Sequence, residues 1–205
     1  MIKVEYDLNE IKRAQKILSG LPNGFSKAAE NASREAMSKL RTMITRAIGA
    51  YYWLKPGYIK KSMYMRIGFR NAELLIRGTR STLGSFNLTP KKAPAKRKAP
   101  GYISGGVRRD HGLTRFSKGF MLEHNNLAVL REGPGRHGSF QGLHILVGPA
   151  VAQIAGAIME EQPEIKEAVK EKYLQSLKKF TRLISTGVLN PGMGGFMNEP
   201  KAFQV

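Results

Sequence analysis

The sequence contains no cysteine and no long apolar run. Without cysteine there are no disulfides, no cysteine-ligated zinc or iron–sulfur centres and no cysteine nucleophile. A membrane-spanning helix needs about 18 consecutive apolar residues, and no segment approaches that length. The first ten residues already carry four charged side chains, unlike a secretory leader. We therefore expect a soluble protein without a membrane partner.

Acidic residues are also scarce. The 205 residues include 34 Lys and Arg but 15 Asp and Glu, which gives a formal charge of +19. Most of the excess lies between Lys55 and Lys118, where 16 basic residues face two acidic ones, Glu73 and Asp110. Such a charge favours association with nucleic acid or with acidic protein surfaces, and the composition does not distinguish these partners.

Signals for catalysis are weak throughout the chain. The four histidines, at positions 111, 124, 137 and 144, lie outside any HExxH pattern. Asp110 and His111 could join a serine on paper, but no GxSxG elbow is present. The glycine-rich stretch 133–138 lacks the spacing of a phosphate-binding loop, and Pro134 removes a backbone donor, so we interpret it as a turn. We predict no catalytic residues, no metal site and no cofactor, and hence no enzyme.

Three segments have the apolar spacing of helices. Residues 11–21 form the first, and Ser26–Ile48 forms a longer one whose buried stripe is rich in alanine. The third runs from Ala150 to Ile184, with Pro163 placed to restart it as a first-turn proline. We expect the alanine stripe to let another backbone approach closely.

Alternating apolar residues predict strands before, and mainly between, the long helices. The strand candidates are 1–8, 63–69, 72–78, 102–107, 116–122, 127–130 and 143–147. We predict an α+β fold with an N-terminal long helix, a central antiparallel β-sheet with a basic extended loop, and a C-terminal helix followed by a flexible tail. Residues 1–185 would form a single domain that includes a basic arm at 81–101, and residues 186–205 would be a C-terminal extension.

The basic arm is the first candidate binding segment. Five cations lie within eight residues, and two more follow in the same basic region: Lys91, Lys92, Lys96, Arg97 and Lys98, then Arg108 and Arg109. Such a cluster can bind phosphates in a salt-dependent way, but no aromatic side chain is interleaved with it for base stacking. DNA contact, docking on an acidic protein and a solvated loop all remain open.

The second candidate is an aromatic cluster beside the Pro56-Gly57 helix break. It comprises Tyr51, Tyr52, Trp53 and Tyr58. Aromatic clusters usually belong to a core, but at the end of a helix they can also anchor a subunit interface. Both interpretations are kept.

The order of these segments resembles the prophage minor tail protein Z family, the tail-completion proteins of long-tailed phages. The resemblance covers roughly residues 27–155 and rests on short motifs in a fixed order. These are the alanine-rich helix, Ile59-Lys60-Lys61-Ser62-Met63-Tyr64-Met65-Arg66, Leu74-Leu75-Ile76-Arg77-Gly78, Gly106-Val107-Arg108, Gly119-Phe120-Met121, 127–133, and Gly148-Pro149-Ala150-Val151. Two features depart from the family: the turn His124-Asn125-Asn126, where the family often has glycine, and the extension beyond Thr186.

The resemblance implies a structural protein of the virion, located in the tail or neck and assembled in the host cytoplasm. It implies a homo-oligomeric ring, which we expect to be hexameric, at the head-proximal end of the tail. The neighbours would be tail terminator, tail tube or head–tail connector proteins, with possible contact to packaged DNA. The alternative is a non-specific nucleic-acid-binding protein that uses the basic region 81–118.

Overall fold

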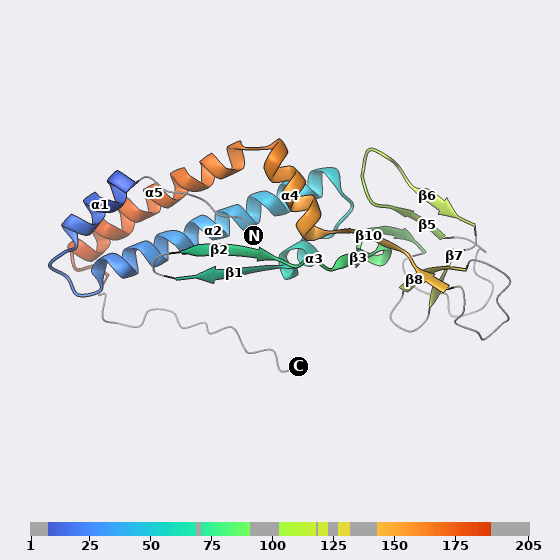
Figure 1. The fold of residues 1–205 in the computed structure, drawn as a ribbon, viewed down its shortest axis with the longest axis horizontal. Coiled ribbons are helices and arrows are strands. Elements are labelled where there is room, and N and C mark those ends of the chain that lie inside the picture. The colour runs from blue at the N-terminus through green and yellow to red at the C-terminus, as the bar shows by residue number, and fades with distance from the viewer. Residues whose placement is uncertain are drawn as a thin grey trace. The chain divides into compact units, whose positions relative to one another are not determined.

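The computed structural model describes residues 8–68, 71–90, 103–117, 119–122, 127–131 and 143–189. It has an α+β fold in which a long helix near the N-terminus, several small antiparallel sheets and a C-terminal helix follow one another (Figure 1). The helices are α1 (Leu8–Ile17), α2 (Gly24–Tyr51), α3 (Pro56–Lys61), α4 (Val151–Glu161) and α5 (Glu164–Ser185), with a short 3-10 turn, η1 (Leu83–Ser85).

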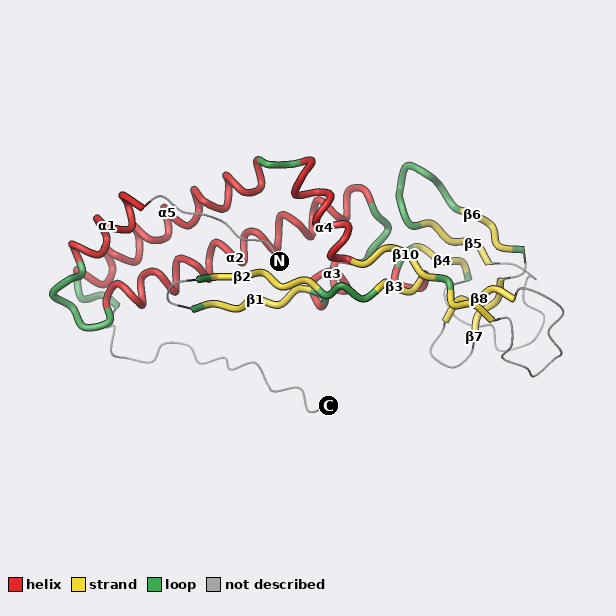
Figure 2. Tube along the Cα trace, viewed as in Figure 1, coloured by secondary structure: helices red, strands yellow, loops and turns green. Residues whose placement is uncertain are grey.

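The strands are three to five residues long. They are β1 (Met63–Ile67), β2 (Ala72–Ile76), β3 (Arg80–Thr82), β4 (Asn87–Thr89), β5 (Ile103–Gly106), β6 (Thr114–Phe116), β7 (Gly119–Leu122), β8 (Leu127–Arg131), β9 (Leu143–Ile145) and β10 (Val147–Ala150). Figure 2 shows them as short segments. They pair as β1-β2, β10-β3, β4-β5-β6 and β7-β8-β9, so the expected central sheet is divided into four small ones.

The helix predictions are confirmed with small differences at the ends. The long helix begins two residues earlier and ends three residues later than its apolar stripe, because helix ends extend past the last buried side chain. The last helical stretch is interrupted at Gln162 and Pro163. Helix α5 begins at Glu164, so Pro163 lies just before the helix and not in its first turn as predicted. The strand predicted over residues 1–8 falls outside the described residues except for Leu8, which begins α1.

The contacts group the chain into two compact units. The helical unit takes its described residues from 8–39, 65–73 and 166–189, and the sheet unit takes its described residues from 40–64 and 74–165. Helix α2 therefore contributes its first half to the helical unit and its second half to the sheet unit.

In the helical unit, α2 and α5 pack antiparallel. A Cβ at Gly24, at the start of α2, would lie 3.5 Å from Ile184, near the end of α5. Further along α2, Glu35 accepts a hydrogen bond from Ser176, which comes earlier in α5. The two helices therefore run in opposite directions. Four alanines on α2 are at most 3% exposed: Ala28, Ala29, Ala32 and Ala36. Side chains this small let helices approach closely, which fits the sequence expectation.

In the sheet unit, the small sheets share a core of Leu83, Leu88, Ile103, Met121 and Ala128. Strands β9 and β10 are separated by one residue, Leu146. Its N–H donates to Ala128 O at 2.9 Å, and its carbonyl accepts from Leu83 N at 2.9 Å. One residue thereby bonds toward β8 and toward η1, which explains why the predicted last strand is divided between two sheets.

The first part of the predicted basic arm is ordered, so the interpretation of 81–101 as one exposed loop is wrong for residues 81–89. This segment contains β3, η1 and β4, and it buries Ser81, Leu83, Phe86 and Leu88. The apolar residues occur too briefly to produce a recognisable strand period, although they pack into the core. Residues 91–102 lie outside the described residues.

Candidate functional site

The end of α2 and the end of β5 run side by side in the sheet unit. The Trp53 N–H donates to Val107 O at 3.0 Å, and the Arg109 N–H donates to Tyr51 O at 2.9 Å. Tyr52 and Arg108 form the antiparallel bridge between these two bonds. The backbone thus joins two candidate groups that are more than 50 residues apart in the sequence.

Arg109 is held by two contacts from this arrangement. Its guanidinium carbon lies 4.1 Å from the centre of the Trp53 ring, a stacking distance at which the cation is attracted to the ring face. Its Nε donates to Gly49 O at 2.9 Å. The last carbonyls of a helix lack intrahelical donors and carry partial negative charge, so Arg109 also caps the C-terminus of α2.

Arg108 is paired differently. Its Nε and Nη2 donate to the two carboxylate oxygens of Asp110 at 3.0 and 2.7 Å, and its guanidinium carbon lies 5.9 Å from the centre of the Tyr52 ring. The hydrogen bonds and charge of Arg108 hold the pKa of Asp110 below its usual value, and those of Asp110 raise the pKa of Arg108. The pair is solvent-exposed, with 45% and 56% of the side chains accessible, so it orients Arg108 more than it stabilises the fold.

A close backbone approach at Gly106 supports this geometry. A Cβ at Gly106 would lie 2.7 Å from Gly112 O, 2.9 Å from Leu113 Cδ2 and 3.4 Å from Trp53 Cδ1. Gly112 itself has a φ of +68°, which side-chain-bearing residues rarely adopt. The two glycines therefore let the 110–113 turn fold back against β5 and Trp53.

We call the residues Tyr51, Tyr52, Trp53, Arg108 and Arg109 the arginine–tryptophan surface. Tyr51, Arg108 and Arg109 are exposed, and Trp53 is half-buried. On another side Trp53 lines a small cleft of about 150 Å³ together with Lys55 and residues of η1 and β4. The described residues offer no carboxylate to Arg109, so its charge remains open to a partner.

Tryptophan, tyrosine and arginine are the residue types that carry most binding energy in protein interfaces. Arg109 is already fixed by its stacking and capping contacts, and a fixed side chain loses less conformational entropy when a partner binds. The arrangement is therefore suited to docking an acidic, partly apolar surface.

The structure joins some predicted site residues and separates others. Tyr51, Tyr52 and Trp53 meet Arg108 and Arg109, which the sequence could not indicate. Tyr58 lies apart on α3, half-buried, where its carbonyl accepts a hydrogen bond from Ser62 Oγ at 3.1 Å. The arm cations Lys91, Lys92, Lys96, Arg97 and Lys98 lie outside the described residues.

Two of the four histidines can be placed. His111 is exposed with its Nε2 3.9 Å from Asp110, and His144 is exposed on β9. Within the described ranges, no group of three or more histidine and carboxylate side chains could hold a metal ion. No helix among the described residues is long and apolar enough to cross a membrane.

One arrangement in the helical unit was missed by sequence reasoning. Glu35 of α2 contacts Ser176, Lys172 and Lys179 of α5 across more than 130 residues of sequence. No local pattern marks such a contact, because it depends on how two helices pack.

Comparison with known protein families, with curated proteins and with solved structures finds no match for the chain.

Proposed function

We propose that the protein is a structural component of a tailed-phage virion that completes the head-proximal end of the tail or joins it to the head connector. It acts as a homo-oligomeric ring, for which we propose six copies, and it functions by docking on neighbouring proteins of the virion. The neighbours are tail terminator, tail tube or connector proteins. The function needs no catalytic residue and no cofactor.

The observation that carries this proposal is the arginine–tryptophan surface. In this cation–aromatic cluster the side chains are held in place by backbone pairing, ring stacking and helix capping. The order of elements adds support, because the family resemblance implies a long alanine-rich helix, short strands and a helix beginning after Gly148-Pro149, and elements of these kinds follow in that order here.

The test is to replace Arg109 with alanine and to assay particle assembly. The variant should keep the fold, because the exposed cation–π contact and the capping hydrogen bond to Gly49 O are each worth only about 1 kcal/mol. We expect electron micrographs of its lysates to show full heads beside unattached tails, and we expect the same of particles made without the protein. Arg109→Lys keeps the charge but loses the planar stacking group, so it should restore assembly only in part.

Arg80→Gln is the matched control, since Arg80 is exposed on β3 of the same unit and loses one charge in the same way. Normal particles from Arg109→Ala, or equal defects in Arg109→Ala and Arg80→Gln, would contradict docking by this surface.

The alternative, non-specific nucleic-acid binding, is favoured by the net charge of +14 over residues 55–118. It predicts tight duplex binding by the wild-type protein near physiological salt, with assembly independent of Arg109. Duplex affinity measured over a range of salt concentrations separates the two functions.

A further inference from the structure

A cleft between α1 and α5 lies within the helical unit. It encloses about 400 Å³, a volume within the range of ligand-binding clefts. Its floor is apolar and formed by Ala14 and Leu177, both buried, with Ile17 at the edge and 53% exposed. An apolar floor of this size can accept one or two side chains of a partner.

A buried hydroxyl group lines the cleft without a hydrogen-bond partner. Thr181 is 5% exposed, and its Oγ1 has no partner. A threonine within a helix can donate to the carbonyl four residues earlier, as Thr45 does to Arg41 O at 2.7 Å. Leaving a buried hydroxyl unpaired costs stability, so the Thr181 hydroxyl is available to a ligand that supplies a polar atom.

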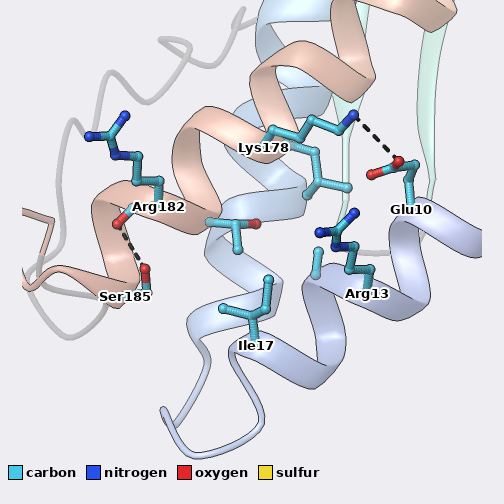
Figure 3. Close-up of a pocket in the computed structure, with 9 residues that line it drawn as sticks. Glu10, Arg13, Ile17, Lys178, Arg182 and Ser185 are labelled. Atoms are coloured by element: carbon cyan, nitrogen blue, oxygen red, sulfur yellow. Dashed lines mark hydrogen bonds and ion pairs between the residues drawn. The ribbon is translucent and has the colours of Figure 1, made fainter.

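Basic side chains outnumber acidic ones around the cleft, with Arg13, Lys178 and Arg182 against Glu10. Figure 3 shows Arg13 extending from α1 toward α5, while Lys178 of α5 reaches Glu10 of α1 with an Nζ–Oε1 distance of 3.4 Å. The Arg182 guanidinium points away from α1. Glu10 is thus already paired with Lys178, and in the described part of the chain no carboxylate lies within ion-pair distance of Arg13. Arg13 and Arg182 both line the cleft without a carboxylate partner among the described residues, and Arg13 is the one whose side chain extends toward the facing helix.

We infer that this cleft binds an acidic peptide segment of a partner protein, in which a leucine-type or phenylalanine-type side chain adjoins a carboxylate. The apolar side chain covers Ala14, Ile17 and Leu177, the carboxylate pairs with Arg13, and a polar backbone atom pairs with the Thr181 hydroxyl. An acidic partner also suits a chain of net charge +19. The inference does not depend on the proposed function, because the cleft shares no residue with the arginine–tryptophan surface.

The experiment uses the full chain and a fluorescein-labelled, end-capped hexapeptide of sequence Glu-Leu-Asp-Glu-Phe-Glu, with binding followed by fluorescence polarisation. Arg13→Gln should weaken binding at least tenfold. Lys12→Gln is the matched control, because Lys12 is an exposed neighbour on the same helix that does not line the cleft; its affinity should stay within twofold of wild type. A peptide with glutamine and asparagine in place of the acids should bind at least tenfold more weakly.

Thr181→Val adds a readout that non-specific charge attraction would not change. The variant has nearly the same shape without the hydroxyl, so it should bind the peptide three- to tenfold more weakly. In the free protein it removes an unpaired buried polar group, so the urea midpoint should rise or stay constant. A clear fall in that midpoint would show that the hydroxyl has a structural partner and would overturn its role in binding.

Three other results would overturn the inference. One is equal weakening by Arg13→Gln and Lys12→Gln, which would indicate general charge attraction. Another is equal affinity for the acidic and neutral peptides. The third is tighter binding of a peptide copied from residues 190–205 of this chain, which would identify its own C-terminal segment as the occupant.

Discussion

Glu35 of α2 contacts three side chains of α5, and the cost of replacing it with glutamine can be calculated. Its Oε2 accepts from Ser176 Oγ at 2.7 Å and lies 3.0 Å from Lys172 Nζ, and its Oε1 lies 3.1 Å from Lys179 Nζ. The Ser176 hydrogen bond, then the two lysines, lower the pKa of Glu35 from 4.5 to about 2, against the opposing effect of burial.

The lowered pKa gives an upper limit for the stabilisation. At about 1.4 kcal/mol for each pKa unit, the difference between the unfolded and folded values corresponds to roughly 3.5 kcal/mol. The carboxylate side chain is 29% exposed, so solvent screens part of this interaction. We expect Glu35→Gln to lower the free energy of unfolding at pH 7 by about 1 to 1.5 kcal/mol, measured by urea denaturation.

The pH dependence follows from the sign of this pKa change. Because the pKa of Glu35 is lower in the folded state, its contribution is fully present above pH 4.5 and is lost as the pH falls from 4.5 toward 2. The stability difference between wild type and Glu35→Gln should therefore be largest at pH 6–7 and shrink as the pH falls through that window.

Glu30→Gln is the matched control on the same helix. Glu30 pairs with exposed Arg34 at 3.3 Å in an i,i+4 arrangement, which is worth about 0.3–0.5 kcal/mol. A Glu35→Gln effect no larger than that of Glu30→Gln, or one that stays constant between pH 7 and pH 3, would refute this account of the α2–α5 contact.

Two further predictions concern the sheet unit and the basic arm. Gly106→Ala should destabilise the fold by about 1–3 kcal/mol in urea denaturation, because the new Cβ would lie 2.7 Å from Gly112 O. The control is Gly49→Ala, which should leave stability unchanged or raise it, because nothing lies within 4 Å of its new Cβ. Equal losses of stability in the two variants would contradict the argument. Replacing the five arm cations 91, 92, 96, 97 and 98 with glutamine should leave the circular dichroism spectrum unchanged and reduce particle assembly. If assembly is instead normal and the slope of log binding constant against log salt concentration for duplex DNA falls by several units, the arm binds DNA.

Much of the fold could be predicted from local pattern. The apolar stripe of α2 repeats over more than 20 residues, so its period is unmistakable, and Pro163 marks the start of α5. The sheet arrangement could not be predicted to the same degree. Strands of three to five residues contain too few side chains to define a period, and β3 and β4 were therefore assigned to an exposed arm.

The sequence predicted the residues of the candidate site, but it did not predict that they contact one another. The aromatic residues at 51–53 and the arginines at 108 and 109 were singled out separately, for their chemistry. Their meeting depends on the pairing of Tyr52 with Arg108, which is a long-range contact between the ends of a helix and a strand. Sequence spacing carries no information about such a contact, and for the same reason Tyr58 was grouped with aromatic residues that it does not join.

The geometry of Arg109 bears on the choice between docking and nucleic-acid binding. Non-specific binding to a phosphate backbone requires positive charge but no fixed orientation, and mobile lysines serve that purpose well. Arg109 is instead oriented by Trp53 and by Gly49 O, and Arg108 is oriented by Asp110. The neutralising effect of Asp110 would be a disadvantage for a phosphate-binding surface, whereas it keeps Arg108 in one orientation for a specific partner. Asp110 thus orients Arg108 but lowers the net positive charge of the site. This arrangement favours an acidic protein surface of defined shape as the partner.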